Sequence, residues 1–139
     1  HAHLVDAELA PYLQVGDKRV EIVGPHIELA PNDALSLGLA IHELATNAAK
    51  YGALSTAEGE VSIAWSKIVP DRVRLEWRER GGPPVSGKPK RGFGTDLIEK
   101  IVAHEFGTPV ELVYRPEGVT CVLTIPVREP TAFAIRARR

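Results

Sequence analysis

Three polar side chains at helical spacing, Glu43, Asn47 and Lys50, are the residues of this sequence best suited to chemistry. They lie in the segment HELATNAAKYG, residues 42–52, where positions i, i+4 and i+7 share one face of a helix. Carboxylate and amide oxygens suit magnesium, which usually binds through one or two protein groups plus substrate phosphates. The segment therefore predicts nucleotide chemistry.

The same segment argues against a zinc protease. Its first five letters are H-E-x-x-T, so Thr46 stands where a zinc-binding helix needs a second imidazole. His42 points about 100° around the helix from Glu43. Two roles stay open for His42, an imidazole that orients a neighbour and a direct phosphate contact, and we do not assign it as a catalytic base.

Composition indicates one globular domain. The chain has 139 residues, 44% of them hydrophobic and 25% charged, which is ordinary for a protein with its own core. With 17 basic and 18 acidic residues, nothing indicates a nucleic-acid partner. No apolar run approaches the ~20 residues of a membrane span, and the lone Cys121 fits a reducing compartment. We expect a cytoplasmic domain, and because the chain starts without Met, a piece of a longer protein.

The order of elements predicts an α+β fold. A strand near Val20 precedes a helix that should begin at 31–33 with a capping side chain and stop at Gly52. A hairpin turning at 69–71, a second helix from Thr95 to Gly107, and a final hairpin around 116–118 follow. The expected buried positions of the two helices are Leu37, Ile41, Leu44, Ala48, then Leu97, Ile98, Ile101, Val102 and Phe106. This order predicts a two-layer α/β sandwich, a mixed sheet with helices on one face.

Three segments in sequence order, HELATNAAKYG, WRERGG and RGFGT, resemble the N box and the two glycine boxes of the histidine-kinase ATP-binding domain. That domain has the Bergerat fold of the GHKL superfamily. More narrowly, the chain resembles the HWE subgroup, through His42, Trp77 and Glu79, the following Gly-Gly-Pro and the adjoining KYGALS. The resemblance covers roughly residues 4–127.

The resemblance implies roles for the helical trio. Asn47 would bind Mg²⁺, which bridges the phosphates of ATP, and Lys50 would lie near those phosphates. Glu43 matches the N-box acid that helps to activate the accepting imidazole. These roles suit phosphoryl transfer, which depends mainly on positioning and on neutralising charge.

The first glycine box, Glu79 to Gly82, is the candidate adenine site. A carboxylate can accept the adenine amino group, and glycines let the backbone approach closely. We expect Trp77 to end the strand, so that Glu79, Gly81 and Gly82 follow it. The wider superfamily has Asp and a second Gly where this chain has Glu79 and Pro83. The HWE subgroup shares that departure.

The second glycine box precedes a helix and is the candidate phosphate loop. Backbone N–H groups of Gly92 and Gly94 can hold phosphate at a helix start, and Thr95 can cap the helix or bond toward adenine. Lys90 and Arg91, with Lys88, either contact phosphates or only keep the loop solvated. Both interpretations stay open.

The resemblance implies the ATP-binding catalytic domain of a sensor histidine kinase. It would pass the γ-phosphoryl of Mg-ATP to a histidine on an upstream dimerisation domain, in cis or in trans, for relay to a response-regulator receiver domain. We expect residues 1–17 to end an upstream helical region or linker, 18–127 to form the domain, and 128–139 to be a flexible tail. None of the five histidines is expected to be the acceptor.

Two alternatives belong to other functional classes. The first is a non-catalytic domain that senses ATP and binds a partner, which retention of both Glu43 and Asn47 disfavours. The second is a different ATPase of the superfamily or a serine kinase of the anti-sigma type. The Trp77-x-Glu79-x-Gly-Gly-Pro signature argues against this second group.

Overall fold

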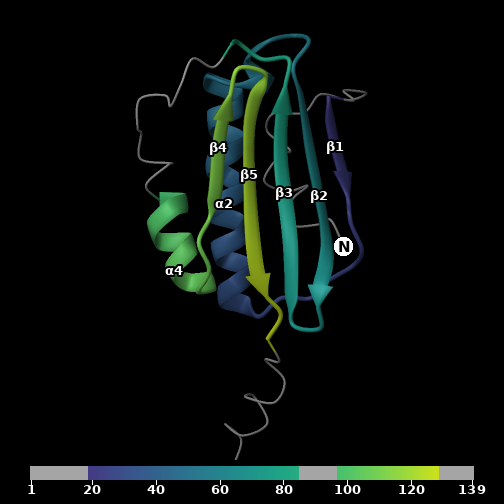
Figure 1. The fold of residues 1–139 in the computed structure, drawn as a ribbon, viewed down its shortest axis with the longest axis vertical. Coiled ribbons are helices and arrows are strands. Elements are labelled where there is room, and N and C mark those ends of the chain that lie inside the picture. Colours follow the sequence, from purple (N-terminus) through teal and green to yellow (C-terminus); the bar gives the residue numbers. More distant parts are fainter. Residues whose placement is uncertain (1–18, 85–96, 129–139) are drawn as a thin grey trace, which may run out of the picture.

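The computed structural model describes residues 19–84 and 97–128 of the chain. A five-stranded sheet in the order β1-β2-β3-β5-β4 forms one layer, and the helices cover one of its faces (Figure 1). The strands are β1 (Val20–Val23), β2 (Glu60–Val69), β3 (Arg72–Arg80), β4 (Glu111–Arg115) and β5 (Gly118–Pro126). The helical elements are α2 (Pro31–Lys50), η2 (Ala53–Ser55), η3 (Leu97–Val102) and α4 (Ala103–Phe106). Because β1 pairs parallel to β2 and the other pairs are antiparallel, the predicted mixed α+β sandwich is confirmed.

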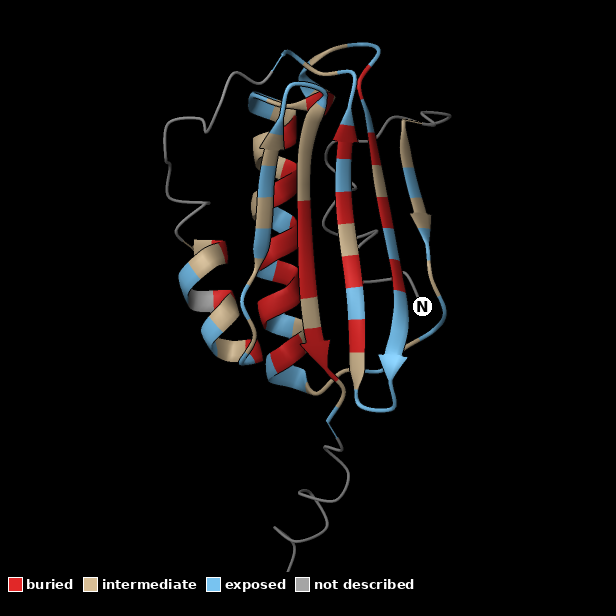
Figure 2. Cartoon of the chain, viewed as in Figure 1, coloured by how far each residue is buried: buried red, intermediate tan, exposed pale blue. Residues whose placement is uncertain are grey.

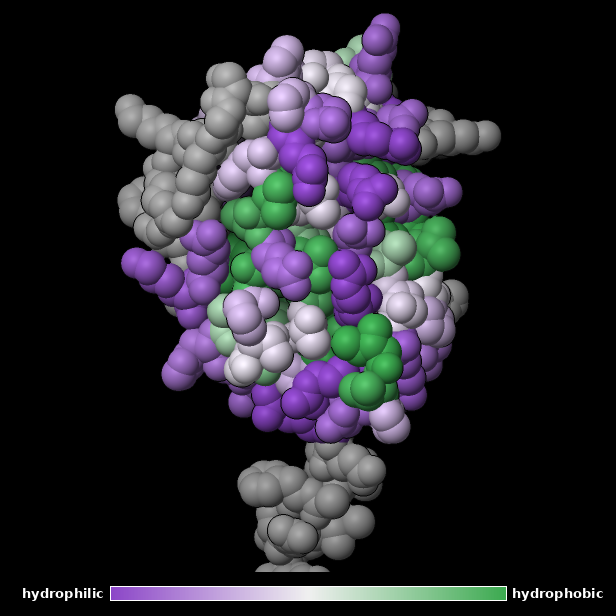
Figure 3. Space-filling model, in the orientation of Figure 1, coloured by the Kyte–Doolittle hydropathy of each residue, from purple (hydrophilic) through white to green (hydrophobic). Residues whose placement is uncertain are grey.

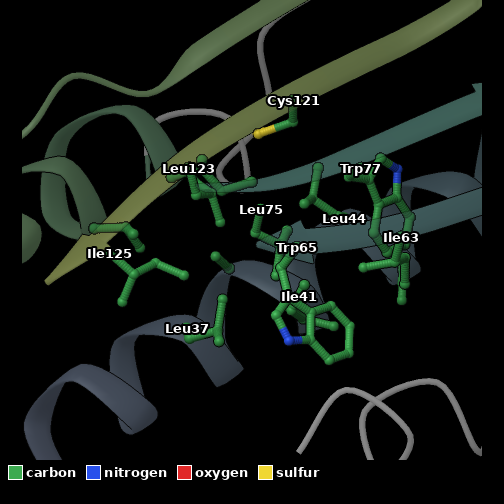
Figure 4. Close-up of a cluster of buried hydrophobic side chains, with 14 of the residues drawn as sticks. Leu37, Ile41, Leu44, Ile63, Trp65, Leu75, Trp77, Cys121, Leu123 and Ile125 are labelled. Atoms are coloured by element: carbon green, nitrogen blue, oxygen red, sulfur yellow. The ribbon is translucent and has the colours of Figure 1, made fainter. Parts of the chain in front are cut away.

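Strand alternation builds the core. Ile63, Trp77 and Cys121 lie in register on β2, β3 and β5, and all three are fully buried. They face the buried stripe of α2, which includes Leu37, Ile41, Leu44 and Ala48 as predicted (Figures 2 and 4). The opposite sheet face carries the exposed side chains of Arg74, Arg78 and Arg80 on β3, and Figure 3 shows hydrophilic and hydrophobic side chains together on that face. One apolar face per layer therefore holds the two layers together.

Strand β3 is longer than the sequence indicated. Trp77 was expected to be its last residue, but the ladder with β2 continues through Val61 opposite Glu79 and Glu60 opposite Arg80. The expected end at Trp77 was wrong because pairing with the start of β2, rather than the following glycines, determines where β3 stops. Glu79 is consequently a strand residue with a fixed, inward direction.

The start of α2 also differs from the prediction. Pro31 is the first helical residue after Ala30, and no side chain in the described part of the chain caps the helix. Pro31 has no N–H that would need an acceptor. Asp33 instead turns inward and is 1% exposed, and its Oδ2 accepts a hydrogen bond from Arg128 Nε at 2.7 Å. Arg128, expected to begin a flexible tail, also donates from Nη2 to the carbonyl of Glu105 at 3.2 Å.

We predict that Arg128→Ala destabilises the domain by about 2–3 kcal/mol, since it leaves the Asp33 charge buried without a partner. This loss of stability should be smaller than the loss from breaking a fully buried ion pair, because the Arg128 side chain is 52% exposed. Urea unfolding measures this change. Arg115→Ala, at an exposed strand end, is the control. In a protein that already carries Asp33→Asn, Arg128→Ala should lower the free energy of unfolding by less than it does in the wild type. An equal loss in both backgrounds would show that the ion pair with Asp33 is not the source of the destabilisation.

The second helix follows the predicted pattern in part where it is described, because Leu97, expected to be buried, is only half-buried at the start of the described segment. A π-helical segment, η3, leads into α4, and Gly107 ends it in a left-handed conformation, φ +74°. Ile98, Val102 and Phe106 are buried one turn apart. The expected start at Thr95 and the side chain of Ile101 lie outside what the structure describes. Within residues 19–84 and 97–128, no helix has the length and apolar character that crossing a membrane requires.

Candidate functional site

The helical trio lies on α2 beside the buried stripe. Glu43 and Asn47 are half-buried, and Lys50 and His42 are exposed. In the described parts of the chain, no hydrogen bond or ion pair engages the side chains of Glu43 or Asn47. Toward the described residues, the Asn47 amide therefore keeps its hydrogen-bonding and ligand capacity. Such a side chain fits one protein ligand of a magnesium ion whose other ligands are phosphates and water.

Glu79 lies over the C-terminal end of α2. Its Oε1 accepts a hydrogen bond from the backbone N–H of Ala53 at 3.0 Å. A Cβ placed on Gly52 would lie 2.2 Å from the same Oε1 and 3.1 Å from the Cα of Ala48, so a larger residue would have to displace the carboxylate from this position. The residue that directly follows the N box is thus bonded to the first glycine box, across 26 positions of the sequence.

The second oxygen of Glu79 is also held by the protein. Trp77 and Glu79 are two residues apart on β3 and point to the same face, and the indole Nε1–H donates to Oε2 at 2.9 Å. Glu79 is 6% exposed. Burial raises the pKa of its carboxyl above the ordinary value, and the hydrogen bonds from Ala53 and Trp77 oppose that rise. The two donors partly compensate the cost of burying the charge.

Burial also raises a pKa on the neighbouring strand, β5. Cys121 of β5 lies opposite Trp77 in the register of the sheet. Desolvation, with the charges of Glu99 and Glu79 adding to it, raises the pKa of Cys121 to about 12. The thiol therefore stays neutral beside the carboxylate and behaves as a small apolar side chain.

Residues 52–59, which connect α2 to β2, contact the first glycine box. Thr56 Oγ1 donates to the carbonyl of Gly81 at 3.1 Å and accepts from the backbone N–H of Gly59 at 3.1 Å. A Cβ on Gly82 would lie 2.8 Å from the backbone of Ala53, and Gly81 has φ +75°. Both glycines of the box are therefore required by backbone contacts and conformation within the protein itself.

Sequence reasoning missed the residues that hold this site together, namely Gly52, Ala53 and Thr56. The letters KYGALS were noted only as typical of a subgroup. The Trp-x-Glu spacing was the available signal for the indole contact, because alternate strand residues share a face. A strand that ends at Trp77 does not include Glu79, so the predicted strand could not show that the two side chains share a face.

Part of the predicted site lies outside the described residues: Lys90, Arg91, Gly92, Gly94 and Thr95. Their contribution to phosphate binding stays a prediction. Among the residues that are described, no group of three or more His, Cys, Asp or Glu side chains could hold a metal ion. A magnesium ion held by one amide and by phosphates needs no such group.

Comparison with known proteins shows clear similarity to histidine kinases. The chain is 45% identical over 130 residues to "Blue-light-activated histidine kinase 1" of Erythrobacter litoralis, which covers 91% of this chain and 36% of that protein. The chain thus spans about a third of the length of this curated relative. No protein-family model matches it.

Two solved structures share the fold at low sequence identity. The histidine kinase domain of the Erythrobacter litoralis EL346 blue-light activated histidine kinase has a TM-score of 0.71 at 16% identity, covering 91% of this chain and 60% of that one. Histidine kinase ThkA in complex with the response regulator protein TrrA has a TM-score of 0.55 at 17% identity, covering 94% of this chain and 39% of that one.

Proposed function

We propose that this chain is the ATP-binding catalytic domain of a histidine kinase of the GHKL superfamily, which binds Mg-ATP and donates the γ-phosphoryl to a histidine on a separate dimerisation domain. Its similarity to histidine kinases in sequence and in fold supports the proposal. The observation that carries the proposal is the bond between Ala53 and Glu79, 3.0 Å long. It brings the candidate base-binding carboxylate to the end of the helix that carries Asn47. Glu79 would then take the adenine, and the α2 residues Asn47 and Lys50 would take the magnesium and the phosphates.

In the proposed site each described residue has a distinct task. Glu79 accepts the amino group of adenine, Asn47 binds Mg²⁺, and Lys50 lies near the phosphates. Magnesium, when bound, neutralises phosphate charge. Glu43, one turn before Asn47, would receive the proton that the attacking imidazole loses or orient that imidazole. Lys90 and Arg91 would add positive charge from the loop between the glycine boxes.

The proposed protein partners are those that histidine kinases use. A histidine-bearing helical hairpin would be the acceptor, and the receiver domain of a response regulator would take the phosphoryl from it. The solved complex of ThkA with TrrA supports a receiver domain as the kind of partner. We place the domain in the cytoplasm and, through its Trp77-x-Glu79 signature, in the HWE subgroup.

Magnesium dependence tests the proposal at Asn47. Asn47→Ala should bind ATP with little or no gain from magnesium, because the amide ligand is removed while the base site is intact. Calorimetric titration of ATP with magnesium and with EDTA gives the gain as a ratio of Kd values. Asn32→Ala, at the exposed start of the same helix, should keep the wild-type ratio. If Asn47→Ala keeps it too, Asn47 is not a metal ligand.

A further inference from the structure

We propose that Trp77 is a positioning residue for base recognition: its indole N–H fixes the Glu79 carboxylate in the orientation that accepts the adenine amino group. The inference rests on the proposed adenine role of Glu79 and assigns to Trp77 a function beyond packing. Three features of the structure support it: the direction of the donors, the immobility of the ring, and the acceptor capacity that remains.

The donors approach the carboxylate at different oxygens. Ala53 N–H bonds to Oε1 at 3.0 Å, and the indole of Trp77 bonds to Oε2 at 2.9 Å. Two such bonds define the plane of the carboxylate, which a single bond would leave free to rotate. Because glutamate has one more rotatable bond than aspartate, a Glu in this box needs a second anchor that an Asp would not.

The indole donor cannot move away from its acceptor. Trp77 is 0% exposed, with Ile63 and Cys121 opposite it on the neighbouring strands, and its ring lies within the buried cluster (Figure 4). A ring packed to this density holds its N–H at one position. Glu79 therefore meets a fixed donor on β3 and the backbone amide of Ala53 in the loop after α2.

The anchored carboxylate can still accept further hydrogen bonds. An ionised carboxylate has about four acceptor positions, and the two protein donors occupy two of them. A hydrogen bond from a ligand N–H to a fixed carboxylate contributes more to affinity than one to a mobile carboxylate, because the fixed side chain loses no conformational freedom on binding. Loss of the indole donor should thus reduce discrimination between bases even where the fold is retained.

Trp77→Phe is the direct test, with Trp65→Phe as the matched control. Trp65 is also buried, but its indole donates to the carbonyl of Pro25 at 2.8 Å. The readout is the ratio of ATP to ITP affinity, because inosine has a carbonyl oxygen in place of the adenine amino group. We expect the ratio to fall on the order of tenfold in Trp77→Phe, the scale of one hydrogen bond to a charged group, and to change less than twofold in Trp65→Phe.

The outcomes separate this inference from the proposed function. If the wild-type domain binds ATP and ITP equally, Glu79 does not read the base, and the adenine role of Glu79 and the positioning role of Trp77 both fail while phosphoryl transfer is untouched. If the wild type discriminates and Trp77→Phe does so equally well, Trp77 only packs, and the positioning role alone is overturned. Should Trp77→Phe not fold, the indole N–H resonances of the wild type decide. The Trp77 signal should shift with ATP and not with ITP, and equal shifts with both would overturn the inference.

Discussion

Replacing Glu79 with alanine is expected to weaken ATP binding by tenfold or more while leaving GTP binding as poor as in the wild type. An ionised carboxylate only accepts hydrogen bonds, so it suits the amino group of adenine and repels the carbonyl oxygen that guanine has at that position. A hydrogen bond to a charged group contributes about 1.5–3 kcal/mol, which is a factor of ten or more in Kd.

The measurement is a titration of each nucleotide against wild type, Glu79→Ala and Glu76→Ala. Glu76 lies on the same strand but faces outward, where it pairs with Arg78, and it should leave both affinities unchanged. Removing Glu79 also leaves the Ala53 and Trp77 donors without an acceptor, so the folded fraction must be measured alongside. Equal wild-type affinity for ATP and GTP would rule out this role for Glu79.

The second large effect is expected at Glu43. Glu43→Gln should reduce phosphoryl transfer to a histidine-bearing hairpin on the order of a hundredfold, the usual contribution of a general base, and reduce ATP binding far less. Glu43 is half-buried on α2, one turn before Asn47, and no hydrogen bond among the described residues engages its side chain. Glutamine keeps the shape of the side chain and removes its basicity.

Transfer rate and ATP affinity are measured on the same preparation, with Glu111→Gln at an exposed position of β4 as control. A loss of transfer that only follows a loss of ATP binding would make Glu43 a binding residue. An unchanged transfer rate would remove Glu43 from the chemistry altogether.

Short-range pattern accounts for the parts of the fold that were predicted correctly. Alternation at Val61, Ile63 and Trp65 identified β2, and the four-residue spacing of Ile98, Val102 and Phe106 identified the second helix. Each of these signals arises within one element, because the side chains that one face buries recur with the period of that element.

The features that were missed depend on contacts between distant residues. Asp33 looked like part of a helix start, yet its partner is Arg128, 95 residues away. The end of β3 is determined by pairing with Glu60, and the need for glycine at position 52 arises from Glu79. No local pattern carries this information. The motifs identified which residues matter, and the tertiary contacts show which of them hold the others in place.

The measurement that tests the account most directly is phosphoryl transfer from radiolabelled ATP and magnesium, with this chain alone and with a histidine-bearing helical hairpin of the family added in trans. We predict no label on this chain alone, because His42 lies beside the groups proposed to hold the phosphates and a fixed helix residue cannot reach in-line geometry at about 3–3.5 Å. With the hairpin added, acid-labile label should appear on the hairpin. Robust acid-labile label on this chain, or ATP binding without any transfer to the hairpin, would contradict the account, and the second result would favour a non-catalytic ATP sensor.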